Sequence, residues 1–168
     1  MMAIEQPEIL FFQEKPVRSL LLVKKADKPI YASIIAKEID STYAHTLNVL
    51  FSLKERGLVV FEKKGRIKHV KITEIGKQVA GILEDFIDMV HLSELSARIE
   101  RVYEKMVLGR PHSKVDQAAV SKRLAPYKRE LERLSKKSHG LKELSNKLTK
   151  RIEEISKGVP APAGPNEL

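Results

Sequence analysis

The sequence predicts a mostly α-helical protein with one small β-hairpin and long helices in its C-terminal half. Three observations carry this prediction. Apolar residues recur at helical spacing through much of the chain. A basic run that alternates with apolar residues, over residues 66–72, follows a β-rich run and a turn containing Gly65, which is typical of a hairpin. Beyond residue 76, apolar positions recur in steps of three and four, the pattern of a long helix with one buried seam.

The first predicted helix begins at Pro16, because the N–H that proline lacks would be unpaired in the first turn anyway. Residues 30–31 are expected to form a short extended piece. Ser33 then has the side chain of an N-cap, and it predicts a helix over residues 34–39.

A turn at Asp40 and Ser41 separates that helix from the next. Ser41 is the expected cap of a helix over residues 42–56, and Gly57 closes it as a residue that tolerates positive φ. A helix, a turn, a second helix and a hairpin, in this order, are the layout of a winged helix-turn-helix.

The hairpin has a strand over residues 58–61, a turn over residues 62–65 and a second strand over residues 66–72. Thr73 then starts the long helix. Its apolar seam runs over residues 75–106 with one slip in phase, and a second helical stretch covers residues 120–155. Pro126 is expected to kink or restart that stretch.

The sequence therefore divides into five predicted segments. They are an N-terminal extension (1–15), a winged helix (16–76), a long helix with a seam for dimerisation (77–109), a basic helical segment (110–157) and a disordered tail rich in proline (158–168). The C-terminal helices can form a coiled coil with a second copy or fold back as a helical hairpin, and the pattern leaves both open.

Charge is unevenly distributed along the 168 residues, whose net charge is +9. Residues 1–76 carry net +4, residues 77–109 carry net −2, and residues 110–157 carry net +8. Two basic blocks indicate a polyanionic partner, although a solvated lysine-rich helix surface gives the same counts. The chain has no cysteine, no secretory leader and no apolar run of membrane-spanning length, so a soluble cytoplasmic protein is expected.

The second helix of the predicted helix-turn-helix has two contrasting faces. A helical wheel places Ala44, Leu47, Leu50, Phe51 and the stem of Lys54 on an apolar face. The opposite face is polar and nearly free of carboxylates: Ser41, Thr42, His45, Asn48, Ser52 and Arg56. These groups can bind phosphates or base edges, which predicts a face that binds double-stranded DNA. An ordinary amphipathic helix is the alternative.

The hairpin supplies the second predicted DNA contact. Basic residues occupy its tip and its second strand: Lys63, Lys64, Arg66 and Lys68. Such a wing would position the domain on phosphates without reading sequence. A small hairpin kept soluble by lysine is the alternative.

The motifs STYAHT (41–46), RGLV (56–59) and VKITEIG (70–76), with Leu50 and Leu53, resemble archaeal winged-helix proteins of the broad MarR-like superfamily. The last motif is similar to their strand-to-helix L-T-x-x-G junction, and the resemblance covers residues 16–82. It implies a winged-helix fold and DNA contacts by Thr42, Tyr43, His45, Thr46, Asn48, Arg66 and Lys68. The chain departs from the full MarR pattern in its short N-terminal extension and its long, charged C-terminal half.

The two predicted C-terminal helical stretches each carry an apolar seam that must pack against another surface. We expect a homodimer to bury them. The predicted dimerisation residues are Ile82, Phe86, Met89, Leu95, Ile99 and Val102. A basic helix over residues 122–157 would add a second nucleic-acid contact, unless its lysines only solvate the outside of a coiled coil.

Signatures of catalysis and of metal binding are missing from the sequence. The five histidines lie far apart, and there is no phosphate-cradling glycine loop with its lysine and no serine nucleophile elbow. We therefore expect no enzyme activity, no metal and no cofactor. The predicted function is that of a dimeric transcriptional regulator. An architectural DNA-binding protein and a winged-helix adaptor that binds another protein are the alternatives.

Overall fold

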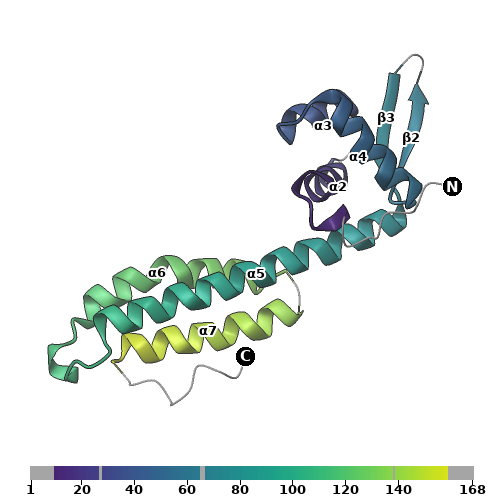
Figure 1. The fold of residues 1–168 in the computed structure, drawn as a ribbon. Helices are drawn as coiled ribbons and strands as arrows, with labels where there is room; N and C mark the ends of the chain where they lie inside the picture. The colour runs from purple at the N-terminus through teal and green to yellow at the C-terminus, as the bar shows by residue number, and fades with distance from the viewer. Residues whose placement is uncertain (1–9, 27, 65–66, 138, 159–168) are drawn as a thin grey trace. The chain divides into compact units, whose positions relative to one another are not determined.

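The structure is a computed structural model that describes residues 10–26, 28–64, 67–137 and 139–158; residues 63, 64, 67, 68 and 139 are described by their backbone only. The chain forms two compact units, Met1–Glu84 and Asp85–Leu168. The predicted fold class is confirmed, because helices dominate, one small antiparallel sheet lies in the first unit, and long helices form the second (Figure 1). The predicted disorder of the tail falls on residues that lie almost entirely outside the described ones.

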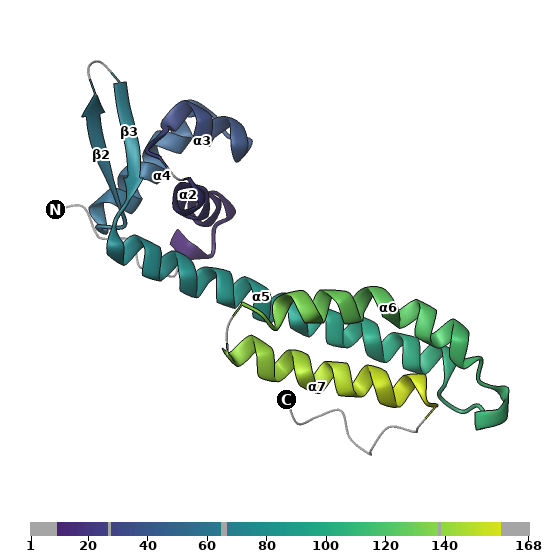
Figure 2. The same cartoon turned by 180° about the vertical axis from the view of Figure 1, so that it is seen from behind.

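The first unit contains three helices and a three-stranded sheet before the long helix α5 begins. Its elements are α2 (Glu14–Lys25), β1 (Ile30–Tyr31), α3 (Ala32–Glu38), α4 (Tyr43–Glu55), β2 (Val59–Lys64), β3 (Ile67–Ile72) and the start of α5 (Glu74–Met106). The β2–β3 hairpin projects from these helices in both views (Figures 1 and 2).

The sheet has the order β1-β3-β2, and both pairings are antiparallel. Val59 lies opposite Ile72 at the base of the hairpin, and Lys64 lies opposite Ile67 near its tip. The short extended piece predicted at residues 30–31 is the third strand, which pairs with β3 at Val70 and His69. A third strand gives the hairpin the support that an isolated pair of strands lacks in water.

The core of the first unit lies where α2, α3 and α4 meet the base of the sheet. Its fully buried side chains include Leu20 of α2, Ile35 of α3, Leu50 and Leu53 of α4, and Val59 and Val70 of the sheet. On α2 the buried residues Pro16, Ser19, Leu20 and Val23 recur in steps of three, one and three, so one face of the helix is covered.

Both predicted N-caps are wrong by one or two positions. Tyr31, in extended conformation, occupies the N-cap of α3, and Ser33 lies inside that helix. Thr42, not Ser41, caps α4, since its side chain accepts a hydrogen bond from the N–H of His45 at 3.2 Å. Ser41 and Thr42 are adjacent hydroxyl residues, so composition alone does not choose between them, and Tyr31 makes no side-chain hydrogen bond as the cap of α3.

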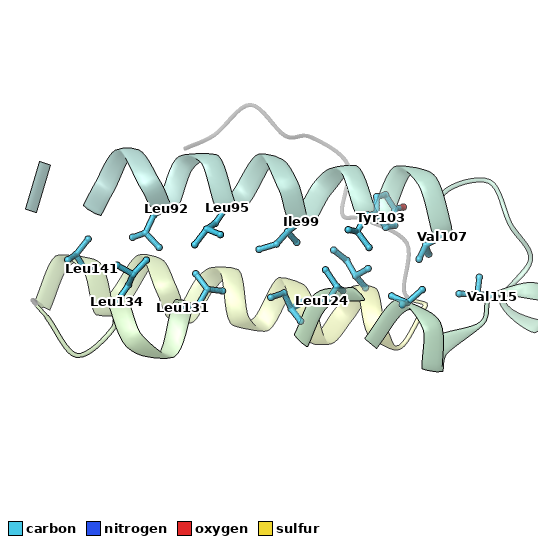
Figure 3. Packing of buried hydrophobic residues seen from close by; sticks show 14 residues of the cluster. Leu92, Leu95, Ile99, Tyr103, Val107, Val115, Leu124, Leu131, Leu134 and Leu141 are labelled. Atoms are coloured by element: carbon cyan, nitrogen blue, oxygen red, sulfur yellow. The ribbon is translucent and has the colours of Figure 1, made fainter. Parts of the chain in front are cut away.

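The second unit is a bundle formed by most of α5 with α6 (Gln117–Leu134) and α7 (His139–Ser156); a 3-10 turn, η1 (His112–Lys114), follows α5. Leu92, Leu95 and Ile99 of α5 face Leu131 and Leu134 of α6 in its core (Figure 3). The predicted restart of the helix at Pro126 is wrong, because α6 runs through this residue as one helix of 18 residues.

Three of the predicted dimerisation residues lie in this core. Leu95, Ile99 and Val102 are only 2%, 0% and 7% exposed, because α6 and α7 fold back on α5 within the same chain. Their assignment to a dimer interface is therefore wrong, and the helical-hairpin alternative holds for this part of the seam. Ile82, Phe86 and Met89, earlier on α5, are exposed.

Candidate nucleic-acid interface

The turn between α3 and α4 sets the direction of the second helix. Asp40 has a φ of 52°, and the N–H groups of Asp40 and Ser41 donate to the carbonyls of Lys37 and Ala36 over 3.3 and 2.9 Å. This is the Schellman pattern, which ends a helix with one left-handed residue and turns the chain sharply. Aspartate tolerates that conformation better than most residues other than glycine.

Two cations from α2 hold the same turn from outside. Lys15 Nζ donates to the carbonyls of Ile39 at 2.7 Å and Asp40 at 3.1 Å, and Arg18 Nη2 donates to the carbonyl of Glu38 at 3.1 Å. These carbonyls are the unpaired acceptors at the end of α3, where positive charge is favourable. The sequence reasoning missed both residues, because they stand more than 19 positions before their acceptors.

The exposed face of α4 carries most of the side chains predicted to contact DNA. Tyr43 is 56% exposed, and Thr42, His45 and Asn48 are exposed as well. Ser41 and Ser52 are half-buried at the edges of this face. From Tyr43 to Lys54 the helix contains no aspartate or glutamate, so this surface is free of carboxylates until Glu55.

The apolar face predicted for α4 is rotated about the helix axis relative to the face that is buried in the structure. The buried residues of α4 are Thr46, Val49, Leu50 and Leu53, whereas Ala44 and Phe51 are exposed. Thr46 is 0% exposed, and its hydroxyl donates to the carbonyl of Thr42 at 2.9 Å. The prediction that Thr46 contacts DNA is therefore wrong, because a threonine whose hydroxyl bonds to its own helix can enter the core.

Phe51 connects α4 to the β2–β3 hairpin. Its ring lies 5.3 Å from the ring of Phe61 on β2, and Lys54 Nζ lies 5.8 Å from the centre of the same Phe61 ring. Arg56 Nη1 donates to the carbonyl of Ser52 at 3.0 Å, which fixes the end of the helix. An aromatic contact between helix and hairpin holds the two predicted DNA-binding elements in a defined relation.

The wing places its basic positions opposite each other. Lys63 lies across the hairpin from Lys68 in the strand register. The side chains of Lys63, Lys64 and Lys68 and the whole of Arg66 lie outside what the structure describes. Nearer the base of the hairpin, Lys71 forms an ion pair with Glu62 at 3.5 Å.

Neither a cluster of metal ligands nor a membrane-spanning helix occurs in the described part of the chain. Within it, no three residues among His, Asp and Glu gather to hold a metal ion. Of the helices that the structure describes, none is both long enough and apolar enough to cross a membrane.

Comparison with known proteins finds partial similarities. No protein-family model matches the chain. An uncharacterized protein of Archaeoglobus fulgidus is 24% identical over 84 residues, which span 48% of this chain and 88% of that protein. The crystal structure of AF1382 from the same organism is similar with a TM-score of 0.45 and 23% identity, over 51% of this chain and 97% of that one. MepR, a transcription regulator of the Staphylococcus aureus multidrug efflux pump MepA, is similar with a TM-score of 0.48 and 18% identity, over 54% of this chain and 70% of its own.

The order α2-β1-α3-α4-β2-β3, with β3 between β1 and β2, is that of a winged helix.

Proposed function

We propose that this protein binds double-stranded DNA through its winged helix and regulates transcription, as expected of a MarR-like regulator. The observation that carries the proposal is the exposed surface of α4, where Tyr43, His45 and Asn48 are all exposed and the helix has no carboxylate from Tyr43 to Lys54. An ordinary surface helix mixes acidic with basic residues, and acidic groups on this face would repel phosphates.

In this proposal the first half of α4 enters the major groove. Asn48 is the residue suited to specificity, because its amide can pair with N6 and N7 of adenine at the same time. The ring of His45 lies about one turn before it, and the hydroxyl of Thr42 lies at the N-cap of the same helix; both would bind phosphates or base edges. Basic residues of the wing would bind the adjacent backbone.

The proposal includes a homodimer and no catalytic activity or cofactor, and it places the protein in the cytoplasm with the nucleoid. Ile82, Phe86 and Met89 of α5 are 69%, 54% and 49% exposed. Large apolar side chains that recur along one stretch of helix are typical of a protein–protein contact. A second copy at this stretch would bring two α4 helices to two half-sites of DNA.

The proposal is tested by selecting duplexes from a random pool with the full-length protein and then measuring affinities for the enriched sequence. We expect one enriched site, and we expect Asn48→Ala to lower the preference for it by about 5- to 100-fold. Asn146→Ala is the matched control, because Asn146 is an exposed asparagine on α7 of the second unit. Equal loss in both variants, or no loss in either, would contradict reading by α4.

An architectural DNA-binding role is the second candidate, and the net charge of +8 over residues 110–157 favours it. Competition at two salt concentrations separates the two functions, since contacts with phosphates weaken steeply as salt rises. A regulator keeps its preferred site at the higher salt, whereas an architectural protein binds all duplexes alike and releases them together. Absence of binding to any duplex at low salt would favour a protein-binding adaptor instead.

A further inference from the structure

A cluster of four cations lines one cavity on the bundle of the second unit, between α5 and α6. The cavity has a volume of about 390 Å³. Its lining consists of Arg98, Arg101, Val102, Lys105 and Met106 from α5 with Arg123 and Tyr127 from α6. The lining contains no carboxylate.

The helices bring these cations to one place. Arg98, Arg101 and Lys105 follow one another in steps of three and four on α5, so they lie along one face over about 10 Å. Arg123 and Tyr127 stand one turn apart on α6 and complete the other side. Cations on two packed helices therefore surround a shared volume, in contrast to a stripe of lysines on a single exposed helix.

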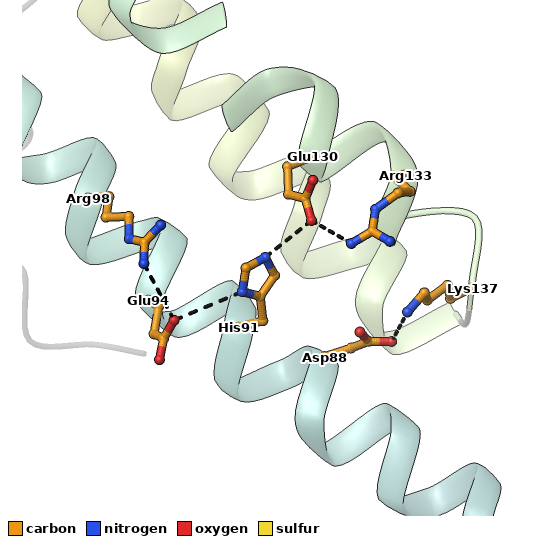
Figure 4. A network of polar contacts seen from close by, with 7 residues as sticks. All are labelled: Asp88, His91, Glu94, Arg98, Glu130, Arg133 and Lys137. Atoms are coloured by element: carbon orange, nitrogen blue, oxygen red, sulfur yellow. Dashed lines mark hydrogen bonds and ion pairs between the residues drawn. The ribbon is translucent and has the colours of Figure 1, made fainter. Parts of the chain in front are cut away.

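Two carboxylates of α5 near the cavity have partners in the bundle. Glu100 binds Arg151 of α7 through both oxygens, at 2.7 and 2.9 Å, and so its charge is used on another side of α5. Glu94 lies 3.8 Å from Arg98 and also approaches His91, which in turn bonds to Glu130 on α6 (Figure 4). Arg98 is thus the one cation of the cluster that this network partly neutralises.

The other three cations have no such neighbour among the residues that the structure describes. Over the described residues, no ion pair joins Arg101, Lys105 or Arg123 to a carboxylate. Like charges held close together repel, so an anion in the cavity would be bound more strongly than at an ordinary surface. An anion with two or more charges meets this arrangement best.

The chemistry of the lining favours phosphate as that anion. Guanidinium groups present paired N–H donors that match phosphate oxygens, and three of the four cations are arginines. Val102 and Met106 give the cavity an apolar part, and Tyr127 offers a ring and a hydroxyl. The volume falls in the range of cavities that bind small molecules.

The geometry points to a phosphate-binding site in the bundle, for a ligand with at least two negative charges. The phosphates belong either to a free phosphorylated small molecule or to the backbone of a nucleic acid. This site lies wholly within the second unit and uses none of the residues of α4 or the wing. It therefore stands whether or not the winged helix reads a DNA sequence.

The test measures binding to the full-length protein by calorimetry, with inorganic tripolyphosphate as one probe and a short DNA duplex as the other. The variant is Arg101→Gln with Arg123→Gln. The matched control is Arg129→Gln with Lys136→Gln, which removes the same charge from exposed positions of the same unit outside the cavity. We expect saturable binding of tripolyphosphate to the unaltered protein and a loss of about tenfold or more in the variant only.

The two probes identify the source of the phosphates. Loss of tripolyphosphate binding with unchanged duplex binding indicates a free phosphorylated ligand. A fall in duplex affinity in the cavity variant alone indicates nucleic-acid backbone. Equal behaviour of variant and control with both probes would overturn the site. If the Gln variant unfolds, Arg101→Met with Arg123→Met removes the same two charges and keeps the apolar stems, and unchanged binding by this second variant overturns the site as well.

Discussion

A Cβ atom on Gly76 would lie 2.0 Å from the carbonyl oxygen of Leu58, so the first turn of α5 rests directly on the backbone that enters β2. Thr73 reinforces this contact. Its hydroxyl donates to the carbonyl of Gly57 at 2.7 Å and accepts from the N–H of Gly76 at 2.9 Å. The VKITEIG motif therefore forms a close backbone contact between the hairpin and the long helix. This contact requires glycine at position 76.

Replacing Gly76 by alanine should destabilise the first unit by about 2 kcal/mol or more, because the added methyl group meets backbone that cannot move aside easily. Denaturant unfolding followed by circular dichroism measures the loss. Gly140→Ala is the control: a Cβ there meets nothing within 4 Å, and alanine in a helix is favoured over glycine by about 1 kcal/mol. A stable Gly76→Ala protein would contradict the close contact.

Thr46→Val should leave DNA affinity within about twofold of the unaltered protein, since this buried side chain is expected to carry none of the energy of a base contact. It should lower stability by about 1 kcal/mol, the usual worth of the hydrogen bond that the hydroxyl makes to Thr42. Fluorescence anisotropy with the selected site measures the affinity. A drop of about tenfold in a folded variant would return Thr46 to the contact surface.

Phe86→Ser combined with Met89→Ser should convert a dimer to a monomer, because it removes two large apolar side chains that are about half exposed in the single chain. Light scattering after size-exclusion chromatography reports the mass. Leu108→Ser is the control, since Leu108 is 56% exposed and lies just after the C-terminal end of α5. A monomer before any substitution would exclude the dimer, and a dimer that survives the double change would place the interface elsewhere.

Arg151→Lys should destabilise the bundle by about 1–3 kcal/mol, because lysine cannot make two parallel bonds to a carboxylate. Arg151 is held by Glu100, which raises the pKa of the guanidinium further, and it lies over the ring of Tyr103 at 4.7 Å. Urea unfolding measures the change. Arg129→Lys, at an exposed position of α6, should change stability little. Equal effects of the two changes would show that the Glu100 pair adds nothing.

Local signals explain what the sequence could predict. Gly57, with a φ of 72°, ends α4 where a positive φ is needed, and the hairpin follows from alternation and a glycine turn. The buried face of α4 was not predictable in this way, because Thr46 satisfies its hydroxyl within the helix and Phe51 leans on Phe61 of another element. The first contact lies within the helix and is not visible in an apolar pattern, and the second depends on tertiary structure.

The seam of α5 shows the same limit on a larger scale. Leu95 and Ile99 have the spacing of a coiled coil, and either a second copy or α6 and α7 would cover them equally well. Nothing local distinguishes the two partners. The cavity cations escaped prediction for a related reason, since Arg101 and Arg123 come together only when α6 folds back on α5.

Glu130 makes the stability of the bundle depend on pH in a defined direction. The hydrogen bond from Arg133 holds the pKa of Glu130 below its ordinary value, and His91 adds to this effect. A carboxylate with a depressed pKa stabilises the folded state fully above its unfolded pKa and loses that contribution as pH falls through the folded pKa. Glu130→Gln should therefore cost more stability at pH 7 than at about pH 3, where the carboxylate becomes protonated in the unfolded chain. Because Arg133 is 61% exposed, solvent screening keeps the cost at pH 7 below about 1 kcal/mol.

Urea unfolding of the unaltered protein and of Glu130→Gln at the two pH values measures the difference in stability. Glu132→Gln, at an exposed position on α6, is the control. A difference that grows on acidification would contradict the sign of the shift.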